Sequence, residues 1–164
     1  MSTPLIRRAE VGDSKAISET LLSAFLEYRF QYTAAGFAAT TPTPDQIFQR
    51  VNEGPVWVAL LNEEIVGTVS VVRRDATTLY VRGMAVLPTA RGLAIGKLLF
   101  NEIEQYAQQQ NYTRLLLSTT PFLDRAIRPY ERLGFVRTDE GPNDLHGTPL
   151  FSMEMPVSSS SHRE

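Results

Sequence analysis

The chain has 164 residues, a formal net charge of −2 and no cysteine. This length is typical of a single domain with a core of its own. Nucleic-acid-binding proteins usually carry a basic face, and no cluster of Lys and Arg occurs here, so nucleic acid is not an expected partner. The lack of cysteine excludes a cysteinyl acyl-enzyme and thiolate metal sites, and two histidines are too few for a histidine-rich metal site. No apolar run could span a membrane and no signal peptide is recognisable, so we expect no metal, no membrane partner and a cytoplasmic location.

The hydrophobic pattern predicts a mixed α/β chain with the order β-α-α-β-β-β-α-β-α-β-β. Residues 1–156 are expected to form one domain, and the polar, Ser-rich residues 157–164 to form a disordered tail. Asp13 is the expected N-cap of the first helix, and the aromatic and small residues over 29–42 carry no predicted element. A long loop is expected over 139–149. The predicted strands cover residues 5–7, 56–61, 65–72, 79–86, 115–118, 135–137 and 150–155, and the predicted helices follow Asp13, cover 44–52, follow the strand over 79–86 and end at Leu133.

The stretch Val-Leu-Pro-Thr-Ala-Arg-Gly-Leu-Ala-Ile-Gly-Lys-Leu-Leu, over 86–99, carries the most chemical information. It is read as the end of a strand, a turn and the start of a helix. The positive end of a helix dipole usually attracts Asp or Glu, but this start carries Arg91 and Lys97 and has no acid before Glu102. An anion on the free backbone N–H groups would offset these cations, and a phosphate suits that position. The sequence therefore predicts a phosphorylated ligand at this turn.

Two common phosphate-binding loops do not fit these letters. A P-loop would need glycine at position 91 and Ser or Thr at position 98, where the chain has Arg91 and Leu98. The dinucleotide fingerprint fails because Gly92, Ala94 and Gly96 are spaced two by two. No Gly-x-Ser-x-Gly segment is present either, which disfavours a serine hydrolase.

The segment Arg91 to Gly96 resembles the coenzyme A pyrophosphate loop of the GNAT N-acetyltransferase superfamily, Arg/Gln-x-x-Gly-x-Gly/Ala. Ala94 stands where glycine is usual, a departure that matters if its φ is positive, because a Cβ is then strained. The strand over 79–86 contains Gly83, which marks a bulge or a close ligand approach. The segment Ala-Ile-Arg-Pro-Tyr-Glu-Arg-Leu-Gly-Phe, over 126–135, is similar to the family's Ala-x-x-x-Tyr-Glu-Lys-Leu-Gly-Phe. The resemblance implies the family fold, a central, mostly antiparallel, splayed sheet flanked by helices.

The resemblance also implies a function. Acetyl-CoA would be the co-substrate, and its acetyl group would pass to a primary amine by direct attack, without a covalent acyl-enzyme. The amine would belong to a small molecule or a protein. Transfer from another acyl-CoA or to a hydroxyl group stays open, as does a non-catalytic acyl-CoA-binding or regulatory module. A homodimer through exposed sheet edges is a further open alternative.

Tyr130 is the candidate acid by resemblance, and it would protonate the departing thiolate. The preceding Pro129 fits most easily if it lies near the first turn of its helix. Leu123 stands where the family often has an Asn that contacts the cofactor, so one polar contact is expected to be lost. A backbone N–H of Val86 or its neighbour is the candidate oxyanion donor.

The general base is not identified from the sequence. The strand over 79–86 offers Arg82 and no acid, and Glu27 and Glu102 are expected to be solvated, which leaves His146 or a water relay. Arg29 and Arg82 are either solvated or hold a carboxylate of the acceptor. The cofactor candidates are Met84, Ala85, Val86, Arg91, Gly92, Leu93, Ala94, Ile95, Gly96 and Lys97, and the acceptor candidates are Phe25, Tyr28, Arg29, Tyr32, Arg82 and His146.

Overall fold

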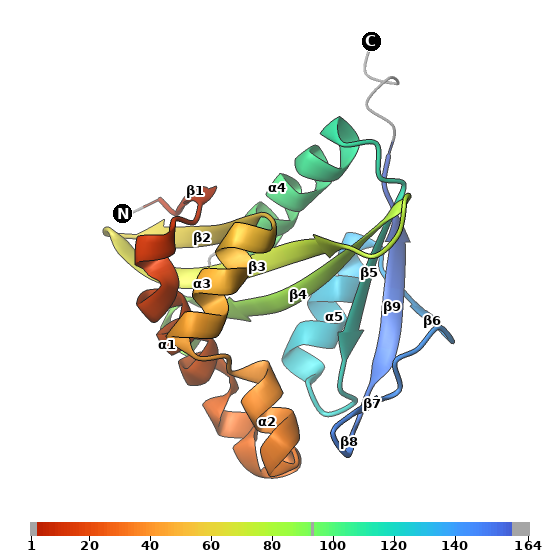
Figure 1. Cartoon of the computed structure of the whole chain (residues 1–164), viewed down its shortest axis with the longest axis horizontal. Helices are drawn as coiled ribbons and strands as arrows, with labels where there is room; N and C mark the ends of the chain where they lie inside the picture. Colours follow the sequence, from red (N-terminus) through yellow and green to blue (C-terminus); the bar gives the residue numbers. More distant parts are fainter. Residues whose placement is uncertain (1–2, 93, 159–164) are drawn as a thin grey trace.

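A central sheet organises the molecule (Figure 1). Within the part that the computed structural model describes, residues 3–92 and 94–158, seven strands form this sheet in the order β1-β2-β3-β4-β5-β9-β6. All neighbours are antiparallel except the parallel pair β4 and β5. The strands are β1 (Leu5–Arg8), β2 (Val56–Leu61), β3 (Glu64–Arg73), β4 (Thr78–Val86), β5 (Arg114–Thr119), β6 (Val136–Thr138) and β9 (Phe151–Pro156), and β7 (Asp144–Leu145) pairs separately with β8 (Thr148–Pro149).

The sheet splits between β4 and β5. These strands pair over four positions, from Thr78 opposite Arg114 to Val81 opposite Leu117, and no further, although β4 continues to Val86. On its other side β4 stays paired with β3 as far as Val86. The edge of β4 that faces β5 therefore has no strand partner after Val81. The predicted fold class, with its mostly antiparallel splayed sheet, is confirmed.

Helices cover both faces of the sheet, and β2 shows how the sequence produces this. Val56 and Val58 lie in a core cluster with side chains of α1 and α3, whereas Trp57 and Ala59 lie in a second cluster with side chains of α4. Because successive side chains of a strand point to opposite faces, a continuous apolar run is buried on both sides. The helical segments are η1 (Val11–Asp13), α1 (Ser14–Phe25), η2 (Leu26–Gln31), α2 (Ala34–Thr40), α3 (Pro44–Glu53), η3 (Pro88–Ala90), α4 (Ile95–Gln109) and α5 (Asp124–Leu133).

Two stretches that were expected to be irregular contain structure. Residues 29–42 include the end of η2 and the helix α2, whose N-cap Thr33 accepts a hydrogen bond from the N–H of Gly36. The loop over 139–149 contains the small β7–β8 hairpin. Thr33 joins the two stretches, because its N–H donates to Thr148 Oγ1 at 2.9 Å and its hydroxyl donates to the carbonyl of His146 at 2.8 Å. The hydrophobic pattern did not predict α2, because Gly and Ala make up most of this helix and Gly36 is its one buried residue.

The predicted N-cap position of α1 is confirmed at Asp13, although its side chain makes no capping bond. Its carboxylate accepts instead from Arg7 at 2.8 and 3.1 Å and from the N–H of Glu10 at 2.8 Å. The easier placement of Pro129 near a first turn is not observed. Pro129 is the sixth residue of the ten-residue α5, inside the helix and not in its first turn. The predicted end of α5 is confirmed, since Gly134 follows Leu133 with φ +115°. Residues 159–164 of the expected tail lie outside the described residues.

Candidate active site

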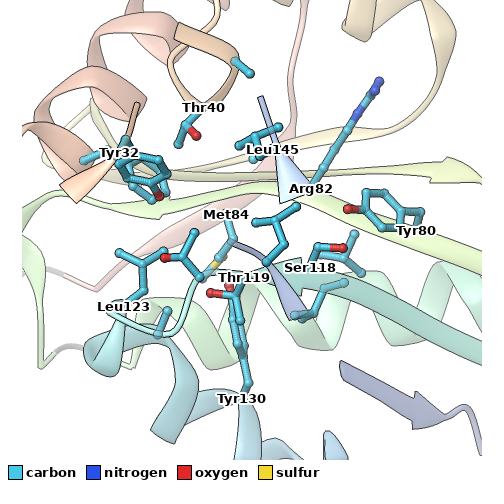
Figure 2. Close-up of a pocket in the computed structure, with 18 of the residues that line it drawn as sticks. Tyr32, Thr40, Tyr80, Arg82, Met84, Ser118, Thr119, Leu123, Tyr130 and Leu145 are labelled. Atoms are coloured by element: carbon cyan, nitrogen blue, oxygen red, sulfur yellow. The ribbon is translucent and has the colours of Figure 1, made fainter. Parts of the chain in front are cut away.

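A cavity of about 190 Å³ lies where β4 and β5 separate. Both strands contribute to its wall, α5 closes one side, and α2, the β7–β8 hairpin and Tyr32, which follows η2, close the other. In Figure 2 the side chains of Tyr32, Tyr80 and Tyr130 approach this space from different elements. Backbone that has lost its strand partner next to an enclosed space can receive an extended ligand by adding it as a strand.

Tyr130 points from α5 into the cavity, toward Thr119 and Met84 (Figure 2). Its ring packs edge-on against Phe100 of α4, with centroids 5.8 Å apart, and the residue is 9% exposed. Burial raises the pKa of Tyr130 above its ordinary value of 10. The hydroxyl therefore keeps its proton at neutral pH.

The α4 N-terminus retains the features expected of an anion site. Its N-cap Ala94 makes no side-chain cap and its first turn contains no acid. The N–H groups of Ile95, Gly96 and Lys97 belong to that first turn, where an α-helix offers no intrahelical acceptor. Gly96 also lies close to β4, because a Cβ there would come within 3.1 Å of the Met84 methyl group. Leu93 was predicted to belong to this loop and lies outside the described residues.

Ala94 has a φ of +59° and ψ of +22°, the left-handed conformation. The glycine that usually stands at this position would adopt it without strain, whereas the Cβ of alanine clashes with the following carbonyl oxygen. Gly92 also has a positive φ, +88°, and a Cβ there would meet nothing within 4 Å. The loop therefore keeps the backbone path of a glycine-rich turn even though one of its glycines is replaced.

Arg91 is already paired in this structure. Its Nη2 donates to Glu27 Oε1 of η2 at 2.9 Å, and both side chains are partly exposed. Glu27 is an exposed residue of a helical segment, as expected, and the sequence did not show that η2 brings it against the loop. An exposed ion pair of this kind contributes about 0–1 kcal/mol, so a phosphate could displace Glu27 at little cost.

The predicted bulge in β4 is confirmed. The register with β3 passes from Thr68 opposite Ala85 to Ser70 opposite Arg82, so that two residues of β4 stand opposite one of β3. Gly83 occupies the bulge with φ +64°. Met84 lines the cavity, Ala85 is buried against the α1 side of the sheet, and Val86 is half-buried.

The backbone of Val86 is directed toward the split in the sheet. Leu87 donates its N–H to the carbonyl of Val66 in β3 at 2.8 Å. Successive amides along a strand point in opposite directions, so the N–H of Val86 points away from β3. It is thus available to a carbonyl oxygen in the gap, as an oxyanion donor must be.

The acceptor candidates divide into two groups. Phe25, Tyr32 and Arg82 line the cavity. Tyr28, Arg29 and His146 are not among the described residues that line it. The Tyr28 ring lies near the Phe122 ring, and the Arg29 side chain is exposed over the Phe30 ring. His146 is exposed on the turn between β7 and β8. Burial raises the pKa of Tyr32.

Three of the lining residues that the sequence analysis missed are informative. Arg50 comes from the last turn of α3, where a basic residue is explained by the helix dipole and gives no functional signal. Tyr80 and Thr119 come from β4 and β5, where Tyr and Thr are ordinary strand formers. The hydroxyl of Thr119 is buried and has no partner in the described part of the chain. Leu123, which stands where the family often has an Asn, lines the cavity and has no side-chain amide to contact a cofactor.

The described residues contain no group of three or more His, Cys, Asp or Glu side chains placed to hold a metal ion. Among the same residues, no helix is long and apolar enough to cross a membrane.

Comparison with known proteins identifies the family. The family model described as the Acetyltransferase (GNAT) family matches residues 19–135, more than half of the chain. Among curated proteins, the uncharacterized N-acetyltransferase YjgM of Escherichia coli (strain K12) is 28% identical over 142 residues, which cover 84% of each chain. The chain thus belongs to the GNAT acetyltransferase family. The enzyme class predicted from the sequence, an acetyl-CoA-dependent N-acyltransferase, is confirmed at the level of this family.

Two further likenesses are more limited. N-acetylaspartate synthetase of Homo sapiens is 28% identical over 134 residues, which cover 81% of this chain but only 42% of the human protein. The crystal structure of PaiA N-acetyltransferase from Thermoplasma acidophilum, solved in complex with coenzyme A, superposes with a TM-score of 0.79 at 15% identity, covering 94% of this chain and 99% of that one. At this identity the structural likeness shows the fold alone.

Proposed function

We propose that this chain transfers the acetyl group of acetyl-CoA to a primary amine by direct attack, with Tyr130 as the acid. The observation that carries the proposal is the split between β4 and β5, with Tyr130 directed into it and the uncapped α4 N-terminus at the end of β4. The extended arm of the cofactor would take the place of the missing strand. Its pyrophosphate would lie on the N–H groups of residues 92–97 with Arg91 and Lys97 nearby, and its thioester near Met84, Ala85 and Val86.

The proposed reaction needs three events. The neutral amine attacks the thioester carbon, and the N–H of Val86 stabilises the oxygen that becomes negative. The C–S bond then breaks, and the Tyr130 hydroxyl gives its proton to the departing thiolate. The nitrogen, positively charged after the attack, loses a proton, which returns through water to the tyrosinate, so the enzyme regains its starting state. Burial raises the pKa of Tyr130, but a thiolate in the same dry cavity is desolvated too, which keeps the transfer feasible.

The acceptor class is open at this stage. The human relative is named as an N-acetylaspartate synthetase, which points to an amino-acid acceptor for that protein. A small-molecule amine and a protein amine both stay in the proposal for this chain. A cytoplasmic location and a homodimer through the edge strands β1 and β6 also stay predictions.

Release of coenzyme A tests the proposal directly. The chain has no cysteine, so a thiol reagent detects only free coenzyme A. The wild type should release it from acetyl-CoA in the presence of one or more amines. Tyr130→Phe should lower kcat tenfold or more while acetyl-CoA affinity stays unchanged, and Tyr112→Phe, between α4 and β5 and outside the cavity lining, should behave as the wild type.

A binding measurement separates the alternatives. Acetyl-CoA at about 100 times its Kd adds about 2.7 kcal/mol, which for this size raises Tm by roughly 5–10 °C. Stabilisation by acetyl-CoA without release of thiol from any amine of a broad panel would favour the non-catalytic module. Wild-type turnover in Tyr130→Phe would remove the tyrosine from the mechanism.

A further inference from the structure

Two arginines from different elements meet at one end of the cavity. Arg50 reaches it from the last turn of α3, and Arg82 from β4 directly before the bulge. The Arg50 guanidinium lies over Gly83, because a Cβ added to that glycine would come within 3.0 Å of Arg50 Nη1. The bulge thus makes room for one arginine while its preceding residue supplies the other.

The guanidinium groups of Arg50 and Arg82 have more N–H donors than hydrogen-bond acceptors among the described residues. Arg82 Nη2 donates to Glu53 Oε1 at 3.0 Å, but Arg82 Nε is buried and has no hydrogen-bond partner in the described residues. Arg50 makes neither a side-chain hydrogen bond nor a salt bridge within residues 3–92 and 94–158. Within those residues, Glu53 is therefore the carboxylate that pairs with these arginines, and it contacts Arg82 but not Arg50. The Glu53 side chain is 56% exposed.

The charge of the pair is poorly compensated. Burial, together with the neighbouring charge of Arg82, lowers the pKa of Arg50 to about 10, and Glu53 offsets this in part. Two cations against one largely solvated carboxylate leave a net positive charge beside an enclosed space. Partly buried charge is unfavourable unless it is paired and hydrogen-bonded, so this end of the cavity is suited to an anion.

We propose that Arg50 and Arg82 bind a carboxylate of the acceptor, so that the acceptor is a free amino acid or a similar small amine with a carboxylate beside its amino group. The inference rests on the proposed function and names the substrate class for the same site. Planar guanidinium groups match the two oxygens of a carboxylate, and Arg82 Nε is left without a hydrogen-bond partner among the described residues. Tyr130 and the separated strands β4 and β5 line the same cavity, so the amine beside that carboxylate would face the thioester there.

The rest of the cavity agrees with a small acceptor. Its volume of about 190 Å³ is below the roughly 300–1,000 Å³ of pockets for drug-sized ligands. None of the described residues that line it is Asp, Glu or His, so no side chain there is an ordinary base for an ammonium group. This lining favours an acceptor whose amine loses its proton easily, to water.

An α-amine meets this requirement better than a lysine. At pH 7.4 an α-amine with a reference pKa of about 8 is neutral in roughly a fifth of the molecules, and a lysine with a pKa of about 10.4 in roughly one in a thousand. These reference values apply to an α-amine without a neighbouring free carboxylate charge. Neutralising that carboxylate with two guanidinium groups brings a free amino acid toward this condition.

Matched substrates test the proposal. The twenty amino acids, their carboxamides and the corresponding amines without a carboxyl group are compared by coenzyme A release at saturating acetyl-CoA. We expect kcat/KM for the best amino acid to exceed that of its carboxamide at least 100-fold. The amine of the carboxamide is no more basic, so amine ionisation alone would predict the opposite order. Equal or faster turnover of the carboxamide overturns the proposal.

Variants connect the preference to the two arginines. Arg50→Met and Arg82→Met should each lower kcat/KM for the amino acid at least 30-fold, mainly through KM, and change it for the carboxamide less than threefold. Arg73→Met, at the exposed end of β3, is the matched control and should keep the wild-type preference. Stabilisation by acetyl-CoA checks that each variant is folded. An unchanged preference in both cavity variants overturns the proposal.

Calorimetry separates this inference from the proposed function. Amino acids are titrated into the wild type and Arg50→Met, each saturated with coenzyme A, so the readout does not depend on turnover. Binding that weakens at least tenfold in Arg50→Met supports the carboxylate site even if no amine is acetylated. Equal binding to both proteins, or no binding to the wild type, overturns the carboxylate site. In that case, turnover of other amines would still support the proposed acetyltransferase function.

Discussion

The left-handed Ala94 leads to a prediction with an unusual sign. Ala94→Gly should make the protein more stable, although glycine usually weakens a helix. Alanine at φ +59° carries a strain of about 1–2 kcal/mol, which glycine removes. Glycine also increases the entropy of the unfolded chain, which costs about 0.4–1 kcal/mol. The side chain is exposed, so no packing is lost, and the difference is a gain of about 0.5–1 kcal/mol.

Thermal unfolding measures this gain. For a domain of this size, 1 kcal/mol corresponds to about 2–4 °C in Tm, so Ala94→Gly should raise Tm by roughly 1–4 °C. The matched control is Ala38→Gly, at an exposed site inside α2, which should lower stability by about 0.5–1 kcal/mol. Two variants with the same chemical change should thus move in opposite directions. If Ala94→Gly destabilises as much as Ala38→Gly, the positive φ and the strain inferred from it are refuted.

Two further predictions concern stability. Pro129→Ala should stabilise the protein by about 1–3 kcal/mol in urea unfolding, because it restores the hydrogen bond that proline removes inside α5; Pro44→Ala, at the favoured first position of α3, should bring no such gain, and equal effects would contradict the reasoning. Asp13→Asn should lower stability by about 1 kcal/mol at pH 7. The hydrogen bond from Arg7 lowers the pKa of Asp13, so its contribution is complete above the unfolded value near 3.9 and is lost as pH falls through the lower folded value. Melts of wild type and variant should therefore converge near pH 2, and the same deficit at pH 7 and pH 2 would exclude this ion pair as the cause.

The sequence determined those parts of the site that depend on neighbours along the chain. Gly83 inside an apolar run indicated the bulge of β4, and Arg91 and Lys97 at a helix start that lacks acids indicated the proposed anion site. Tyr130 could be singled out by its segment, and Gly134 fixed the end of its helix. Each of these signals is local, because turn geometry, capping and side-chain alternation are settled within a few residues.

The tertiary structure decided what these segments meet. Arg50 and Arg82 are 32 positions apart, and only the packing of α3 over the β4 bulge brings both to one cavity. Likewise, η2 places Glu27 on Arg91 across 64 positions, and Thr33 ties α2 to the β7–β8 hairpin across 115. Apolar periodicity specifies which face of an element is buried, but many partners would satisfy it equally. The proposed acceptor end of the site is assembled from such distant contacts, and for that reason the sequence could suggest the cofactor loop but not the proposed carboxylate site.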